Sequence, residues 1–300
     1  MRVAAIDCGT NTIKLLIGDL PDVEVREMRM VRLGQGVDAT GRLADEALDR
    51  TFAAIDEYAE LIAAHDVARI RFCATSASRD AENADVFVAG VRERLGVEPE
   101  VVSGDEEAAL AFDGAVRNLR STPADPVLVV DIGGGSTELV LGAAADGPTD
   151  AVSLDIGSVR LHERHLHSDP PTADQVAACV TDIDTHLGRS PVPLVRAATV
   201  VGVAGTVTSV GAGVLDLAAY DRSLVDQAEL GVDDVHALAE RLLAMTTAER
   251  LDLPWLHPGR ADVIGAGALI LSRVLRRTGV ATLVVSEADI LDGIAWSLVR

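Results

Sequence analysis

The sequence predicts an α/β protein made of two similar domains. Its 300 residues suit two domains of about 150 residues, each with a core of its own. Hydrophobic residues make up 48% and charged residues 24%, which is typical of folded rather than disordered chains. Two segments, around Asp7 and around Asp131, share one strand–turn–strand pattern. We therefore expect duplicated α/β domains that face one another across a cleft.

The elements of the first domain follow from hydrophobic periodicity and turn residues. Residues 3–20 contain two apolar runs around a polar, glycine-containing turn, which predicts a β-hairpin. The segment 121–126 gathers Ser, Pro and Asp, so we expect domains over 1–122 and 123–287, with a helix at about 288–300 packing back on the first domain. The other expected elements are a helix over 43–64, a strand running into a loop over 69–78, a helix over 85–95, a short strand over 97–102 and a helix over 104–119.

The second half starts with the same pattern, since residues 126–142 predict a strand, a glycine turn and a strand. A shift of 124 residues (131 − 7) superimposes the two copies. The aligned pairs are Asp7 with Asp131, Gly9 with Gly133, Thr12 with Ser136, Lys14 with Glu138, Leu15 with Leu139 and Gly18 with Gly142. The uncharged stretch 197–215 is long enough for a membrane span, but its four glycines favour a strand, a glycine loop and a helix start.

Charge and cysteine usage exclude several classes. A net charge of −21 argues against nucleic-acid binding, which relies on basic surfaces. The three cysteines are widely spaced without a CxxC pair, as expected for reduced thiols rather than a disulfide framework or a zinc site. The apolar run at the N-terminus is too short for a signal peptide. We expect a cytoplasmic protein that binds neither nucleic acid nor a membrane.

Both glycine turns are candidate phosphate cradles. Glycine lets backbone N–H groups approach a phosphate, and neighbouring hydroxyls add donors. The alternative for either turn alone is an ordinary hairpin turn. The pair favours binding, because each has an Asp at the end of an apolar strand, where a carboxylate is costly without a partner. The candidate substrate-binding residues are Gly9, Thr10, Asn11 and Thr12 in the first turn and Gly133, Gly134, Gly135, Ser136 and Thr137 in the second.

Eight segments spread along the whole chain carry a resemblance. In chain order they are DCGTNTIKLLIG, ATSASRDAEN, SGDEEA, DIGGGSTELVLG, GSVRLHER, GVAGTVTSV, RADVIGAGALIL and SEADILDGIAW. With these segments the sequence resembles the exopolyphosphatase/guanosine pentaphosphate phosphohydrolase (Ppx/GppA) family of the actin, Hsp70 and sugar-kinase superfamily. It departs from the usual family pattern in having Thr10 and Thr12 where serines are common, which keeps the hydroxyls.

The resemblance implies two actin-like (ribonuclease H-like) ATPase domains and a phosphoanhydride hydrolase. The implied substrate is inorganic polyphosphate, from which the enzyme removes the terminal phosphate, and the alternative is guanosine pentaphosphate. We expect short polyphosphate chains to be preferred, because the net charge of −21 repels long polyanions and no C-terminal helical extension follows in this sequence. More remote alternatives are an actin-like kinase and a non-enzymatic nucleotide-binding scaffold. Both a monomer and a homodimer stay open.

The adjacent glutamates Glu106 and Glu107 separate on physical grounds. Ser103 and Glu106 fit a capping box at the start of a helix, which gives Glu106 a structural role. Glu107 lies about 100° further around that helix, above the small residues Ala111 and Gly114. Spacing alone favours a solvated surface glutamate. The resemblance assigns the catalytic base to the second glutamate of this motif, and therefore to Glu107.

Carboxylates of the second turn are candidate metal ligands. Asp131 and Glu138 are seven residues apart on opposite arms of the hairpin. Two carboxylates beside a phosphate suit Mg²⁺, which keeps water and phosphate oxygens as further ligands. The alternative is an unremarkable turn Asp and an exposed strand Glu. The resemblance makes both of them ligands of Mg²⁺, or of Mn²⁺ instead, with Asp7 as a further, water-mediated ligand.

Basic groups are candidates for holding phosphate oxygens. Lys14 is the only lysine among 26 basic residues and aligns with Glu138, so one hairpin would offer a cation and the other an anion. A solvated strand lysine is the alternative. Arg79 suits bidentate binding of phosphate but is equally compatible with the surface, and the resemblance favours binding. Gly205, Thr206 and Thr208 resemble a third phosphate loop that opens a helix, where N–H groups attract anions.

One constellation carries little weight. The histidines His162, His165 and His167 crowd one segment, but no cysteine or carboxylate pair stands beside them at a usual zinc spacing. We expect no metal site there.

Overall fold

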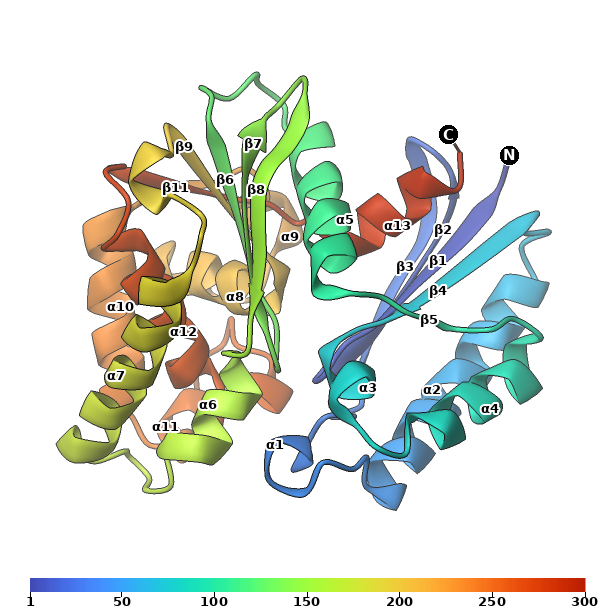
Figure 1. The fold of residues 1–300 in the computed structure, drawn as a ribbon, viewed down its shortest axis with the longest axis horizontal. Helices are drawn as coiled ribbons and strands as arrows, with labels where there is room; N and C mark the ends of the chain where they lie inside the picture. Colours follow the sequence, from blue (N-terminus) through green and yellow to red (C-terminus); the bar gives the residue numbers. More distant parts are fainter. Residues whose placement is uncertain (300) are drawn as a thin grey trace. The chain divides into compact units, whose positions relative to one another are not determined.

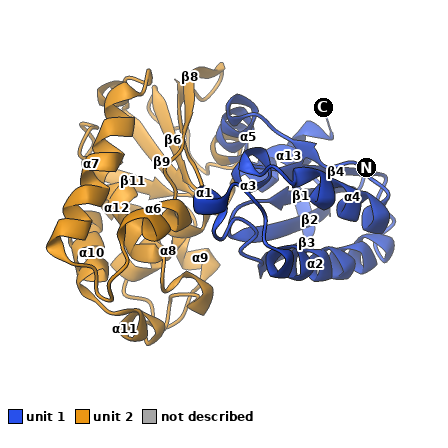
Figure 2. Cartoon of the chain, turned by 60° about the horizontal axis from the view of Figure 1, so that its bottom comes forward, with its two compact units in different colours: residues 1–114, 290–300 blue, residues 115–289 orange. Residues whose placement is uncertain are grey.

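The computed structural model describes residues 1–299, which form two compact units. Unit 1 contains Met1–Gly114 and the C-terminal segment from Ile290, and unit 2 contains Ala115–Asp289 (Figure 2). The domain limits expected from the sequence, 1–122 and 123–287, stay a prediction. The helix α13 (Ile290–Ser297) contacts β1 and β2 of unit 1.

Unit 1 holds one five-stranded sheet in the order β3-β2-β1-β4-β5. The strands β1, β2 and β3 form an antiparallel meander, and β4 and β5 run parallel to β1. Its strands are β1 (Val3–Cys8), β2 (Thr12–Asp19), β3 (Asp22–Met30), β4 (Arg69–Ala74) and β5 (Glu100–Val101). Besides α13, its helices are α1 (Val37–Thr40), α2 (Asp45–Ala63), α3 (Ser76–Asp80), α4 (Ala84–Leu95) and α5 (Gly104–Arg117), the last of which ends just past the unit boundary.

Alternation along β1 decides which side chains enter which core of unit 1. Ala4 and Ile6 join a core that includes residues of α2 and α4, whereas Ala5 joins a smaller core with residues of α5 and α13. Asp7 follows the parity of Ala5, so its carboxylate projects from the face that carries α5 and α13. On β2 the parity of Leu16 places Lys14 on the same face.

Unit 2 holds a six-stranded sheet in the order β10-β11-β9-β6-β7-β8. Its meander β6-β7-β8 can be followed in Figure 1. Its strands are β6 (Val127–Ile132), β7 (Thr137–Ala143), β8 (Gly147–Leu154), β9 (Thr199–Val203), β10 (Glu229–Gly231) and β11 (Thr282–Val285). Its helices are α6 (Ser158–His165), α7 (Ala173–Arg189), α8 (Ala204–Val214), α9 (Arg222–Val225), α10 (Val232–Ala244), α11 (Thr247–Leu251) and α12 (Ile264–Leu275), with two 3₁₀ turns at Leu194–Arg196 and Pro258–Arg260.

The two sheets share one topology. The meander β1-β2-β3 corresponds to β6-β7-β8, and the parallel strands β4 and β5 correspond to β9 and β11. Asp7 stands opposite Lys14 across the first hairpin, as Asp131 stands opposite Glu138 across the second. The 124-residue repeat found in the sequence is therefore a repeat of structure, and the predicted mixed α/β fold with two similar domains is confirmed.

Several local features differ from the sequence-based expectations. The third strands β3 and β8 were not predicted, because each lies at a sheet edge and is mainly exposed or half-buried, without a continuous apolar run. The expected loop after β4 contains the short helix α3. The expected glycine loop within 197–215 is replaced by a direct passage from β9 into α8, where Ala204 adopts a φ of 66°.

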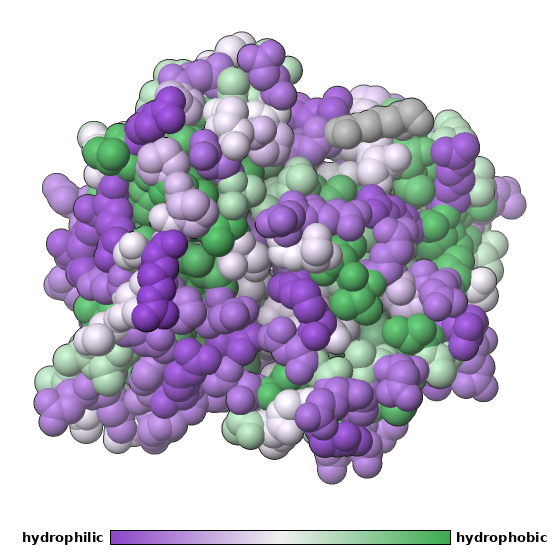
Figure 3. Space-filling model, in the orientation of Figure 1, coloured by the Kyte–Doolittle hydropathy of each residue, from purple (hydrophilic) through white to green (hydrophobic). Residues whose placement is uncertain are grey.

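Surface properties agree with an acidic, polar protein. Hydrophilic side chains cover the surface over α6 and α7 in unit 2 (Figure 3). Among residues 1–299, no helix is both long and apolar enough to cross a membrane. The cysteines Cys8, Cys73 and Cys179 are buried and unpaired.

Candidate functional site

The turn between β1 and β2 is braced by the chain that follows β3. Backbone N–H groups of Val31, Arg32 and Gly34 donate to the carbonyls of Thr10 and Asn11 at 2.9 to 3.1 Å. Because the C=O and N–H of a trans peptide point in opposite directions, the next two N–H groups face away from this brace. The predicted first cradle thus presents amide donors, with Thr10 itself buried.

In unit 2 the turn between β6 and β7 is braced in the same way, by the helix α6. The first turn of α6 donates to the carbonyls of Gly133, Gly134 and Gly135 at 2.6 to 3.1 Å. The N–H groups of Gly134, Gly135 and Ser136 must therefore point away from α6. A neighbouring contact fixes the chain further, since the Thr137 hydroxyl donates to a backbone carbonyl in the segment before α6, at 2.6 Å. The second predicted cradle is a row of amides held by the helix behind it.

Gly157 explains why a glycine precedes α6. A Cβ at this position would lie 2.4 Å from the Gly134 carbonyl oxygen and 2.6 Å from the Gly135 carbonyl carbon. Contacts this short with backbone cannot be relieved by a side-chain rotation, so only glycine lets the helix reach the loop. The segment GSVRLHER is therefore part of the second cradle's support.

Asp7 and Lys14 form an ion pair on the sheet face that carries α5. Lys14 Nζ lies 3.2 Å from Asp7 Oδ2, and both side chains are largely buried. This pair occupies the position of the Asp131–Glu138 pair in unit 2. The first hairpin thus carries an ion pair where the second carries two carboxylates. The role of Asp7 as a water-mediated metal ligand and the role of Lys14 on phosphate stay predictions.

Glu107 is buried on α5, with 7% of its surface exposed. Its Oε2 accepts a hydrogen bond of 2.9 Å from Arg79 Nη1, which also donates to the Val102 carbonyl at 3.0 Å. The Thr75 hydroxyl is a further hydrogen-bond partner of the carboxylate. Arg79, expected to clamp phosphate, is thus held beside the predicted base. Spacing alone had favoured a surface position for Glu107, and the structure contradicts that.

Burial is the main cause of an unusual proton affinity at Glu107. Desolvation raises the pKa of its carboxyl from 4.5 to about 7, and the Arg79 guanidinium limits the rise. The negative charge of Asp7 adds to it. Glu106 differs in every respect, because its carboxylate is nearly half exposed and pairs with Arg71 at 2.6 Å. A pKa near 7 is the range in which a carboxylate can both accept and return a proton.

The raised pKa predicts a pH-dependent stability. The folded protein binds the proton of this carboxyl more tightly than the unfolded chain does, because the pKa is about 7 in the folded state and 4.5 in the unfolded state. The contribution of this group to stability is therefore complete below pH 4.5 and is lost as the pH rises through 7. The loss is on the order of 3 kcal/mol for a shift of this size. Thermal unfolding of wild type and Glu107→Gln should therefore show a gap in Tm that widens in favour of the variant from about pH 5 to 8. Glu106→Gln supplies the baseline, and a pH-independent gap for Glu107→Gln would contradict the burial argument.

Asp131 and Glu138 lie opposite one another on β6 and β7 and are 6% and 1% exposed. Both belong to the sheet face opposite the main core of unit 2, because Val130 and Leu139 enter that core. Two buried carboxylates on one face offer hard oxygen ligands of the kind that Mg²⁺ and Mn²⁺ prefer. No group of three His, Cys, Asp or Glu that could hold a metal occurs within residues 1–299. A pair of carboxylates is the donor set that suits Mg²⁺, which takes few protein ligands and completes its shell with water and phosphate oxygens.

The residues expected to form a third phosphate loop, Gly205, Thr206 and Thr208, lie within α8, which starts at Ala204 directly after β9. Gly205 is covered by Arg260, whose Nη2 would lie 2.2 Å from a Cβ at that position. Thr206 and Thr208 are buried within the first two turns of α8, each 6% exposed. Their contact with phosphate stays a prediction. Sequence reasoning missed Arg260, although it opens one of the matching segments; its guanidinium also reaches Ser209 Oγ at 3.3 Å.

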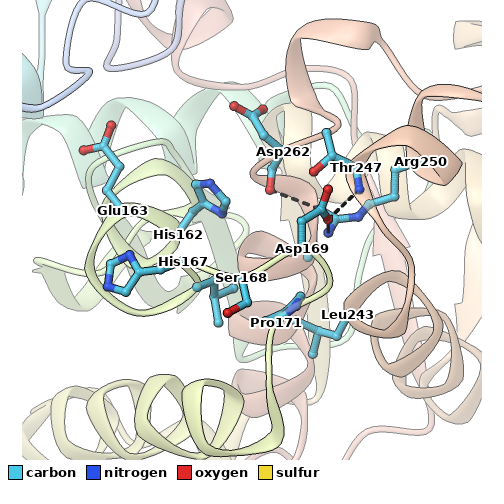
Figure 4. A pocket seen from close by; sticks show the side chains of 12 residues that line it. His162, Glu163, His167, Ser168, Asp169, Pro171, Leu243, Thr247, Arg250 and Asp262 are labelled. Carbon is cyan, nitrogen blue, oxygen red and sulfur yellow. Dashed lines mark hydrogen bonds and ion pairs between the residues drawn. The ribbon is translucent and has the colours of Figure 1, made fainter.

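The histidine-rich segment lines a cavity of about 260 Å³ in unit 2 (Figure 4). His162 and His167 stand on its wall with Glu163, and the Arg250 guanidinium donates to the Asp262 carbonyl at 3.1 Å. His165 instead bonds Asp182 at 2.8 Å, outside the cavity lining. His165 thus ties α6 to α7, whereas His162 and His167 contribute to the cavity wall.

Glycine turns with oriented amides, a buried glutamate of raised pKa and a pair of buried carboxylates are the kinds of group that phosphoryl transfer to water requires. The model of the Ppx/GppA phosphatase family matches residues 18–299, and the chain belongs to this family. The family, the actin-like two-domain fold and the enzyme class predicted from the sequence, a phosphoanhydride hydrolase, are confirmed.

Individual relatives are similar over nearly the whole chain. Exopolyphosphatase 2 of Mycobacterium tuberculosis is 49% identical, across 99% of this chain and 98% of that protein. A solved exopolyphosphatase-like protein is 45% identical with a TM-score of 0.96, covering 99% of this chain and 98% of that one. A solved exopolyphosphatase from Cytophaga hutchinsonii is 27% identical with a TM-score of 0.90, over 99% and 97% of the two chains. These relatives agree with the exopolyphosphatase activity expected from the sequence.

Proposed function

We propose that this phosphohydrolase removes the terminal phosphate of inorganic polyphosphate, with Glu107 as the general base and a divalent cation held by Asp131 and Glu138. The observation that carries the proposal is the buried Glu107 carboxyl, whose pKa of about 7 suits proton transfer from water near neutral pH. The relatives named exopolyphosphatase support the choice of substrate.

Glu107 acts on water. In its ionised form the carboxylate accepts a proton from a water molecule as that molecule attacks phosphorus in line with the leaving oxygen. Arg79 holds Oε2 at 2.9 Å, so the carboxylate has a fixed orientation. The same guanidinium favours the ionised form and keeps the pKa from rising further. Substitution of this neighbour would therefore affect the base as well as any phosphate contact.

The cradles act on phosphate oxygens. Amides at Asn11 and Thr12, and at Gly134, Gly135 and Ser136, are directed by the bonds of the preceding carbonyls before any substrate arrives. Donors that are already oriented need no reorganisation as negative charge develops, which makes them effective in phosphoryl transfer. Lys14 contributes a positive charge beside the first cradle, tempered by its ion pair with Asp7.

Asp131 and Glu138 hold the cation, which we take to be Mg²⁺, with Mn²⁺ as the alternative. When bound, such an ion neutralises charge on phosphate oxygens and aligns them. The protein keeps both carboxylate ligands on one sheet face and almost wholly away from bulk water. Both ligands belong to the hairpin that carries the second cradle, so the cation and the amides would serve the same phosphate group.

Release of orthophosphate tests the proposal. Polyphosphate should yield orthophosphate without nucleotide or acceptor, and EDTA should stop the reaction. Guanosine pentaphosphate, assayed in parallel, reports the alternative substrate, and a higher kcat/KM for it would replace polyphosphate in the proposal. A requirement for an acceptor would indicate a kinase. No release from either compound would leave a nucleotide-binding scaffold.

The buried, unpaired cysteines are compatible with the reducing cytoplasm, where we place the reaction.

A preference for short chains is part of the proposal. A net charge of −21 repels long polyanions everywhere except near local cations, so kcat/KM should fall as chain length grows. Added salt should reduce the difference by screening, since the Debye length shrinks to about 8 Å at physiological ionic strength. The measurement is kcat/KM against chain length at two ionic strengths with free Mg²⁺ held constant. A preference for the longest chains at low salt would contradict it.

A further inference from the structure

A third residue belongs to the row formed by Asp131 and Glu138. Ser153 on β8 stands directly opposite Glu138 on β7, so the three residues follow one another across the meander on one sheet face. Ser153 Oγ donates a hydrogen bond of 2.7 Å to Glu138 Oε1. The carboxylate that receives it is 1% exposed. The row therefore consists of a carboxylate on β6, a second carboxylate on β7 and a hydroxyl on β8.

The duplicated sheet of unit 1 contains a comparison for this row. There the corresponding residues are Asp7, Lys14 and Met28, which face one another across β1, β2 and β3. Where the central residue is a lysine, its neighbour on the third strand is a methionine. Where the central residue is a glutamate, that neighbour is a hydroxyl within hydrogen-bond distance. The hydroxyl thus accompanies the central glutamate and is absent from the copy whose central residue is a lysine.

We propose that Ser153 is a positioning residue that aims Glu138 at the divalent cation. The inference rests on the proposed function, in which Glu138 is a metal ligand. A glutamate side chain rotates about three bonds, and its carboxylate can present either oxygen to a metal. A hydrogen bond to Oε1 fixes the plane of the carboxylate and hence the direction of Oε2. Partners of this kind commonly change metal affinity by about 10- to 100-fold when they are removed.

A purely structural role for Ser153 makes a different prediction. If the hydroxyl only compensated the burial of Glu138, its loss would lower stability and leave metal affinity unchanged once the protein is folded. If it aims the ligand, the affinity falls even in a fully folded variant. Metal affinity of the substrate-free protein therefore separates the two roles.

The experiment measures Mn²⁺ binding to the substrate-free protein by electron paramagnetic resonance of the unbound ion. Ser153→Ala should raise the Kd about 10- to 100-fold. Ser153→Thr keeps the hydroxyl and should stay within a few-fold of wild type. Thr149→Val is the matched control, since its hydroxyl donates to the Leu141 carbonyl on the same pair of strands, at 3.1 Å. Circular dichroism confirms that each variant is folded at the assay temperature.

Each outcome decides one claim. An unchanged Kd in folded Ser153→Ala, together with raised values in Asp131→Asn and Glu138→Gln, overturns the role of Ser153 and leaves the metal site intact. An unchanged Kd in all three variants, or no Mn²⁺ binding by wild type at millimolar concentration, overturns the proposed metal site and the inference with it. An equal loss in Thr149→Val would show a general effect of the strand, which also contradicts the proposal.

Discussion

Glu107→Gln should lower kcat by about 10²- to 10⁴-fold while KM changes only modestly. The amide keeps the shape of the side chain and can still contact Arg79, which lies 2.9 Å from Oε2 in the wild type. It cannot accept a proton from water, so the loss falls on the chemical step. Steady-state release of orthophosphate from polyphosphate measures both constants.

The adjacent Glu106→Gln is the matched control. Its backbone N–H donates to Ser103 Oγ at 3.2 Å, which is the Ser103 half of the predicted capping box. Its carboxylate pairs with Arg71 at 2.6 Å instead of supplying the other half. We expect a small change in stability and wild-type turnover. If Glu107→Gln also kept kcat within a few-fold of wild type, Glu107 would lose its role as the base.

Asp131→Asn and Glu138→Gln should each raise the Mg²⁺ concentration for half-maximal activity at least about 10-fold, because each replaces one negatively charged ligand of the same ion by a neutral amide. The two carboxylates face each other across one hairpin and are 6% and 1% exposed, so bulk water cannot replace them easily. Metal titrations at fixed substrate concentration measure the effect.

Asp146→Asn serves as the control for that titration, since Asp146 is an exposed carboxylate in the turn between β7 and β8. Its curve should superimpose on that of wild type. Unchanged titrations for both Asp131→Asn and Glu138→Gln would remove the metal from this hairpin. A response of one variant alone would make the other residue a neighbour of the ligand rather than a ligand.

Local sequence patterns were enough to predict the repeated hairpins. Each copy combines a run of buried apolar residues with glycines at one offset, and the same offset appears in the register of Asp7 with Lys14 and of Asp131 with Glu138. The edge strands β3 and β8 escaped prediction because their burial is partial and their composition polar. Pairing with β2 and β7, rather than hydrophobicity, makes them strands.

Long-range contacts set the properties of the site that sequence could not supply. The buried Glu107 carboxylate is paired with Arg79, which is 28 residues away in the chain. Gly205 is covered by Arg260, which is 55 residues further along (260 − 205). The hydrogen bond from Ser153 to Glu138 spans 15 residues and two strands. No helical or strand periodicity encodes such pairs, so the role of Glu107 was reached through the family resemblance and not through its spacing.

The pH dependence of kcat/KM at saturating Mg²⁺ tests the central claim most directly, because kcat/KM reports the pKa of groups in the free enzyme. Because burial raises the pKa of Glu107 to about 7, kcat/KM for polyphosphate should rise about tenfold per pH unit below 7 and level off above it. The residual activity of Glu107→Gln should lack this limb. A wild-type kcat/KM that stays constant down to about pH 5.5, where a carboxyl with that pKa is almost fully protonated, would contradict the assignment of Glu107 as the base.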